Sequence, residues 1–106
     1  MRTNFCGELN KKFIGKEVTI CGWIHRRRDH GGVIFLDIRD TTGIVQIVIR
    51  PETKETFKIA EQVRSEFVLK ATGNVEERPE DSENTTLTTG EIEIDCSSIE
   101  VLNTAE

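Results

Sequence analysis

The side chains best suited to chemistry form a basic run in the first third of the chain. Arg26, Arg27 and Arg28 follow one another, and His30 stands two residues later, in front of two glycines. Guanidinium groups can contact phosphates or stack on nucleobases. A run of charge alone is more typical of a solvated surface, so this run gains meaning only if other ligand-binding side chains meet it in space.

The rest of the sequence contains no convincing catalytic or metal-binding pattern. It lacks a phosphate-binding glycine loop, a dinucleotide fingerprint, H-E-x-x-H and G-x-S-x-G. Its three cysteines, Cys6, Cys21 and Cys96, form no C-x-x-C pair, which argues against a zinc knuckle. Their odd number and wide spacing are typical of a reducing, cytoplasmic environment. These features predict a binding module rather than an enzyme.

Length and charge narrow the class of protein further. The 106 residues suffice for one small domain, placed at 1–106, and we expect neither a membrane span nor a secretory signal. A net charge of −5 argues against a protein that coats nucleic acid indiscriminately, since such proteins are normally basic. The charge is unevenly distributed, so a local basic site stays compatible with it.

The hydrophobic pattern predicts five strands and one helix. The strands are expected at 17–28, 33–39, 44–49, 67–75 and 91–101, joined by turns at 29–32 and 40–43 and a long loop at 79–90. Gly22 inside the first strand predicts a bulge or bend there. After Pro51, apolar residues recur every three or four positions, which predicts an amphipathic helix from about 52 to 65.

Three strands, a helix and two strands are the order of elements in the oligonucleotide/oligosaccharide-binding (OB) fold. We therefore expect an all-β domain with one helix, a five-stranded Greek-key barrel whose helix lies between strands 3 and 4. Its binding surface would be the face of the second and third strands with the loops at 29–32 and about 76–90. The residues expected in the core are Ile20, Ile34, Leu36, Ile38, Val45, Ile47, Val63, Leu69 and Ile94.

Alternation within the strands predicts which side chains face that surface. Phe35 either stacks a nucleobase or lies under a neighbouring loop, and alternation favours neither. The amide of Gln46 either pairs with a base edge or is an ordinary solvated group. Glu93 either accepts from a base or belongs to a charged fringe, and Arg78 either serves the long loop or pairs with nearby acids. Their convergence on one side of one barrel favours ligand binding.

The sequence also resembles a known family. Residues 21–40 read Cys-Gly-Trp-Ile-His-Arg-Arg-Arg-Asp-His-Gly-Gly-Val-Ile-Phe-Leu-Asp-Ile-Arg-Asp and resemble the N-terminal domain of bacterial aspartyl-tRNA synthetases. Met-Arg-Thr-Asn-Phe-Cys-Gly at the start, Gly-Ile-Val-Gln at 43–46 and Thr-Gly-Glu-Ile-Glu at 89–93 resemble it too, so the likeness covers essentially the whole chain. The R-R-R-D-H-G-G-x-I-F-x-D-x-R-D form resembles the aspartyl enzymes, rather than their asparaginyl and lysyl relatives.

This resemblance implies an OB-fold anticodon-binding domain that precedes a class II catalytic domain, which this segment lacks. It implies that Phe35 stacks on the middle anticodon base and that Gln46 hydrogen-bonds it. Arg28 and Glu93 would lie around the first two bases. Arg78 and Asn84 would attend the third base.

The resemblance further implies that the complete enzyme attaches aspartate to tRNA(Asp) through aspartyl-adenylate. That enzyme would use ATP and magnesium and would be a cytoplasmic homodimer, whereas this segment would bind tRNA without a cofactor and catalyse nothing. One alternative is a sequence-tolerant single-strand-binding OB protein, against which the negative net charge argues. Another is a protein- or sugar-binding OB module, in which the outward arginines would be incidental.

The Asp-His-Gly-Gly loop at 29–32 raises a question of substrate breadth. It resembles the loop of family members that also charge tRNA(Asn), whose anticodon differs from that of tRNA(Asp) only at the third base. A neutral imidazole at His30 presents either a donor or an acceptor, which would let the loop tolerate both bases. The alternative is that His30 caps the turn and approaches no base.

Overall fold

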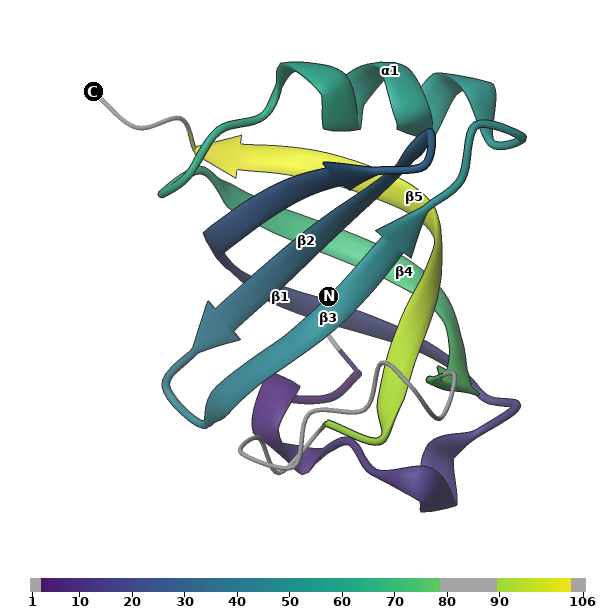
Figure 1. Cartoon of the computed structure of the whole chain (residues 1–106). Coiled ribbons are helices and arrows are strands. Elements are labelled where there is room, and N and C mark those ends of the chain that lie inside the picture. The colour runs from purple at the N-terminus through teal and green to yellow at the C-terminus, as the bar shows by residue number, and fades with distance from the viewer. Residues whose placement is uncertain (1–2, 79–89, 104–106) are drawn as a thin grey trace.

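The computed structural model describes residues 3–78 and 90–103, and its strands close into a barrel (Figure 1). The strands are β1 (Glu17–His30), β2 (Val33–Asp40), β3 (Gly43–Ile49), β4 (Val68–Glu77) and β5 (Ile92–Asn103). The helix α1 (Lys54–Gln62) lies between β3 and β4, and two 3-10 turns, Cys6–Glu8 and Lys11–Phe13, precede β1. The predicted order of elements is confirmed.

Strand pairing brings distant parts of the sequence side by side. The order around the closed barrel is β1-β2-β3-β5-β4, and β4 pairs with β1 to complete it. All pairs are antiparallel except β3 and β5, which run parallel through Ile47–Ile94 and Val48–Asp95. This mixed five-stranded barrel with its helix between β3 and β4 confirms the predicted OB-fold.

Aliphatic side chains fill the barrel. All nine residues predicted for the core are buried, none more than 3% exposed. Figure 1 shows α1 lying across one end of the barrel, where Ala60 is buried and Phe57 packs against the core. The hydroxyl of Thr56 donates to the carbonyl of Ser97 at 2.8 Å, which attaches the helix to β5.

Two local predictions were wrong. The helix is shorter than 52–65 because the chain is already extended at Val63, with φ −77° and ψ 155°, and Glu66 then takes a positive φ of 75°. The bulge of the first strand lies between Ile24 and Arg26, so the bulge alternative for Gly22 was wrong. A Cβ at Gly22 would lie 2.4 Å from the carbonyl oxygen of Arg39, so this glycine permits close approach of β2.

The described residues contain neither a membrane-spanning helix nor a cluster of metal ligands. No helix among them has the length and apolar character needed to cross a membrane. Within 3–78 and 90–103, no group of three or more His, Cys, Asp or Glu side chains is placed to hold a metal ion. Cys6, Cys21 and Cys96 are all free thiols.

Candidate functional site

A bulge in β1 decides which arginines face the outer surface of the barrel. Ile24 pairs with Ile38 of β2, and Arg26 pairs with Asp37, the preceding residue of β2. Two steps along β1 therefore match one step along β2, and His25 is the extra residue. Such an insertion moves every following side chain to the opposite face of the strand.

The bulge decides which of two neighbouring arginines faces outward. Beyond it, Arg28 pairs with Phe35, which faces outward, whereas Arg27 pairs with Leu36, which is fully buried in the core. Without the extra residue, alternation from the first half of β1 would direct Arg28 inward. The bulge thus selects Arg28 for the outer face of β2 and β3.

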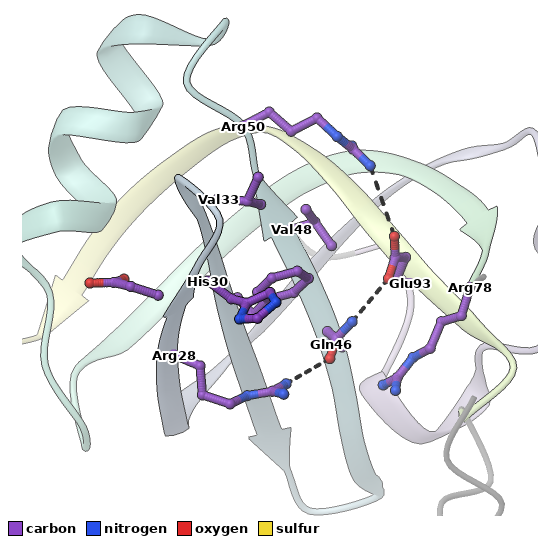
Figure 2. Close-up of a pocket in the computed structure, with 10 residues that line it drawn as sticks. Arg28, His30, Val33, Gln46, Val48, Arg50, Arg78 and Glu93 are labelled. Atoms are coloured by element: carbon purple, nitrogen blue, oxygen red, sulfur yellow. Dashed lines mark hydrogen bonds and ion pairs between the residues drawn. The ribbon is translucent and has the colours of Figure 1, made fainter. Parts of the chain in front are cut away.

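A pocket of about 580 Å³ lies on this outer face (Figure 2). Its lining consists of Arg28, Asp29, His30, Val33, Phe35, Gln46, Val48, Arg50, Arg78 and Glu93. Six of the nine residues predicted for the site are in this set: Arg28, His30, Phe35, Gln46, Arg78 and Glu93. Arg26 and Arg27 do not line it, and Asn84 lies outside the described residues.

Phe35 forms an apolar part of the pocket wall. Its ring is half-buried between two cross-strand neighbours, Arg28 on β1 and Val48 on β3. The guanidinium carbon of Arg28 lies 5.5 Å from the ring centroid, within the range of a cation–π contact. The arrangement provides an apolar ring with a cation over it, which suits a planar, electron-rich ligand.

The amide of Gln46 is locked between a cation and an anion. Nη2 of Arg28 donates to Oε1 of Gln46 at 2.7 Å, and Nε2 of Gln46 donates to Oε1 of Glu93 at 2.9 Å (Figure 2). A guanidinium only donates and a carboxylate only accepts, so the amide has a single satisfactory orientation. One lone pair on Oε1 and one proton on Nε2 are left for a ligand.

Glu93 is a buried carboxylate, only 4% exposed. Burial raises its pKa above the ordinary value, and Glu76 adds to this rise by repulsion. The hydrogen bond from Gln46 and the positive charges of Arg50 and Arg78 oppose it. Buried ionisable groups with shifted pKa values concentrate at functional sites, because a structural role alone is served better by an apolar residue.

Arg78 is a second buried charge in the wall, 6% exposed. Its Nε donates to the carbonyl of Ile92 at 3.1 Å, which fixes the side chain against the start of β5. Burial lowers the pKa of Arg78, while Glu93 and Asp37 counteract this effect. The sequence left two alternatives for Arg78, a role at the long loop and a local pair with acids. Residues 79–89 of that loop lie outside the described residues, and the described neighbours include the carboxylates of Glu93 and Asp37, which act on Arg78 through their charge.

Arg50 lines the same pocket and was missed by the sequence reasoning. Nη1 of Arg50 pairs with Asp95 at 2.5 Å, and Nη2 lies 3.4 Å from Glu76 and 4.0 Å from Glu93. The sequence could have revealed Arg50 as a candidate site residue, because Gln46, Val48 and Arg50 alternate along one face at the end of β3.

Arg27 points away from the pocket, toward the helix. Its Nε donates to the carbonyl of Ala60 in the last turn of α1 at 3.3 Å, and its Nη1 lies 3.3 Å from Asp29. A basic side chain in this position interacts favourably with the negative end of the helix. Arg26, in contrast, is exposed on the outer face of β1.

Comparison with known proteins gives a consistent result. Residues 18–102 match the tRNA anti-codon family, described as "OB-fold nucleic acid binding domain". The fold is similar to that of asparaginyl-tRNA synthetase from Pyrococcus horikoshii, with 30% identity and a TM-score of 0.81 over 97% of this chain and 23% of that one. It is also similar to aspartyl-tRNA synthetase from Entamoeba histolytica, with 27% identity and a TM-score of 0.81 over 93% and 21% of the two chains.

A third solved structure matches over nearly its full length. OBody AM2EP06, solved bound to hen egg-white lysozyme, shares 28% identity and a TM-score of 0.85, over 99% of this chain and 96% of the OBody. The present chain thus spans less than a quarter of either synthetase but almost all of this smaller protein.

Proposed function

The chain belongs to the OB-fold nucleic acid binding domain family, and from this premise we propose that it is the anticodon-binding domain of an aspartyl-tRNA synthetase. The observation that carries the proposal is the locked amide of Gln46 in the same pocket as the ring of Phe35. A stacking surface combined with a fixed donor–acceptor pair can hold one base and read its edge. The likeness to aspartyl- and asparaginyl-tRNA synthetases supports the assignment.

The pocket is suited to a uracil as the middle base of the anticodon. Stacking on Phe35 would contribute about 1–3 kcal/mol regardless of which base is present. Uracil offers an N3 proton between two carbonyl oxygens, so Oε1 of Gln46 accepts from N3 while Nε2 donates to a carbonyl. Cytosine offers a lone pair at N3, which opposes the lone pair of Oε1. A freely rotating amide would adapt to cytosine, but Arg28 and Glu93 prevent this rotation.

The charged residues of the wall serve the neighbouring bases. Glu93 is an acceptor and matches the amino and ring N–H groups of guanine, the first base of an aspartate anticodon. Arg28 and Arg78 are donors, and Arg78 would face the third base from the edge of β5. Three arginines and two carboxylates line the pocket, so recognition depends on a pattern of donors and acceptors more than on positive charge.

The proposed parent enzyme joins aspartate to tRNA(Asp) as a cytoplasmic homodimer and uses ATP and magnesium. In this proposal, ATP and magnesium belong to the catalytic domain of the parent enzyme. The contribution of this domain is to bind and orient the anticodon.

Binding to RNA hairpins tests the proposal. The hairpins carry the aspartate anticodon GUC or a single change of its middle base, and affinities are measured by fluorescence anisotropy. We expect the change from U to C to weaken binding by about tenfold, corresponding to roughly 1.4 kcal/mol. Equal affinity for both hairpins and for an unstructured RNA of the same length would contradict the proposal and favour a sequence-tolerant single-strand binder.

A further inference from the structure

Arg50 is surrounded by three carboxylates that come from two different strands. Glu76 lies on β4, while Glu93 and Asp95 lie on β5. Arg50 itself follows the last residue of β3, which runs parallel to β5. The guanidinium therefore joins three neighbouring strands at the upper rim of the pocket, as Figure 2 shows for its pair with Glu93.

This arrangement makes Arg50 a poor contact for a phosphate. Both terminal nitrogens of the guanidinium already face carboxylates, at 2.5 Å from Asp95 and 3.4 Å from Glu76. Three negative charges around one positive charge leave the immediate surroundings negative, which repels a phosphate. The side chain of Arg50 is 38% exposed, against 6% for the side chain of Glu93.

Glu93 needs such a partner to remain an acceptor. Its carboxylate loses water on burial, and Glu76 repels it from β4. Three groups from the packed elements favour its ionised form: Gln46 on β3, Arg50 after β3 and Arg78 after β4. Gln46 contacts Oε1 of Glu93, whereas Arg50 approaches Oε2, so the two hold the carboxylate from opposite sides.

We propose that Arg50 is a positioning residue that holds Glu93 ionised and oriented, and so fixes the orientation of Gln46, without itself contacting RNA. The proposal rests on the function proposed above for the pocket. Without Arg50, Glu93 protonates at a higher pH. A protonated Glu93 can donate to a base that requires an acceptor.

The first test uses the ligand-free protein and does not depend on any RNA. The carboxyl carbon of Glu93 is followed by NMR as a function of pH in wild type, R50M, R50K and R64M. R64M removes the same charge from an exposed arginine outside the pocket. We expect R50M to raise the pH at which Glu93 titrates, R50K to raise it less, and R64M to leave it unchanged. Identical titration in wild type, R50M and R50K would overturn the proposal.

The second test measures hairpin binding as a function of pH and salt. We expect R50M to bind the GUC hairpin about tenfold more weakly than wild type at mildly acidic pH and to recover as Glu93 ionises at higher pH. The dependence of log affinity on log salt should not change. A slope shallower by roughly 0.7 would show a lost phosphate contact and overturn the proposal. If R50M does not fold, R50K provides both measurements.

These outcomes separate the two proposals. If wild type binds no hairpin with preference for GUC, the proposed function fails, while the titration of Glu93 still decides the role of Arg50 as its positioning residue. If wild type binds as expected and substitution of Arg50 leaves the titration of Glu93 unchanged, only the present inference fails.

Discussion

The guanidinium of Arg28 determines which way the amide of Gln46 faces, through a 2.7 Å hydrogen bond between residues 18 positions apart. Arg28 also lies over the ring of Phe35 and 3.5 Å from Asp37. Its Nε is shielded from solvent and has no hydrogen-bond partner among the described residues. A buried donor left unpaired costs about 1–3 kcal/mol of folding stability. The contacts that Arg28 makes with Gln46, Phe35 and Asp37 are therefore formed at a cost in folding stability.

Substitution of Phe35 by alanine should weaken binding of the GUC hairpin by about 1–3 kcal/mol, because the stacking surface is lost. The melting temperature should change little, since the ring lines the pocket rather than the core. Phe57→Ala is the matched control: it removes a ring that packs against the core and should lower the melting temperature without changing affinity. The opposite pattern for Phe35 would place its ring in a structural role.

Substitution of Gln46 by alanine should reduce discrimination at the middle base more than it reduces affinity for other hairpins. The amide pairs with one base edge, so its loss penalises uracil specifically. Affinities for hairpins with each of the four middle bases provide the measurement. An equal loss for all four would show that Gln46 supports the pocket without reading the base.

The basic run should divide into two kinds of arginine. Arg26→Met should make the slope of log affinity against log salt shallower by roughly 0.7, because we expect this exposed side chain to contact a phosphate. Arg27→Met should leave the slope unchanged and lower the melting temperature, because Arg27 bonds to Ala60 at the end of α1. This differs from the sequence-based expectation, which treated all three arginines of the run as candidate contacts for phosphates or bases. A shallower slope for Arg27→Met would contradict the structural assignment.

Asp40 should make stability depend on pH in the acidic range. Burial raises its pKa, but hydrogen bonds from Thr42 and from the backbone N–H of Cys6 outweigh this effect and lower the pKa below 3.8. A lowered pKa in the folded state contributes stability above about pH 4 that is lost as the pH falls further. Asp40→Asn should cost about 2 kcal/mol at pH 7 and show a smaller loss in acid, measured by urea unfolding. Parallel stability profiles for the two proteins would contradict this.

His30, the last residue of β1, lines the pocket. We expect the full-length parent to charge tRNA(Asn) as well as tRNA(Asp), and His30→Leu to sharpen the choice, because leucine offers neither donor nor acceptor. Charging assays on both tRNAs provide the measurement. Discrimination of about 10³-fold or more by the wild-type enzyme, which corresponds to about 4 kcal/mol, would contradict this expectation.

Alternation along single strands was sufficient to find Phe35, Gln46 and Glu93, because each lies on a strand whose core residues are obvious. It would have placed Arg27 outward and Arg28 inward, the reverse of the structure, because the bulge shows only in how β1 pairs with β2. Alternation along single strands also could not predict the partners of Arg50. Asp95 is 45 positions away and comes next to Arg50 only through the parallel pairing of β3 with β5.

The end of the helix illustrates the same limit. Val63 and Phe67 continue the helical spacing of apolar residues, and both contact the core. They do so from chain outside the helix, because Val63 is extended and a turn with a positive φ at Glu66 precedes Phe67. The periodicity of apolar residues alone therefore predicts a helix that is a few residues too long at each end.

The extra residue at His25 has a consequence for the transfer of this pocket to other barrels. Copying Arg28, Phe35 and Gln46 onto an OB scaffold whose first strand runs without interruption would turn the grafted guanidinium into the hydrophobic interior. A successful graft must carry the insertion along with the side chains, and a single-codon deletion at this point in the gene would be far more damaging than most substitutions around it.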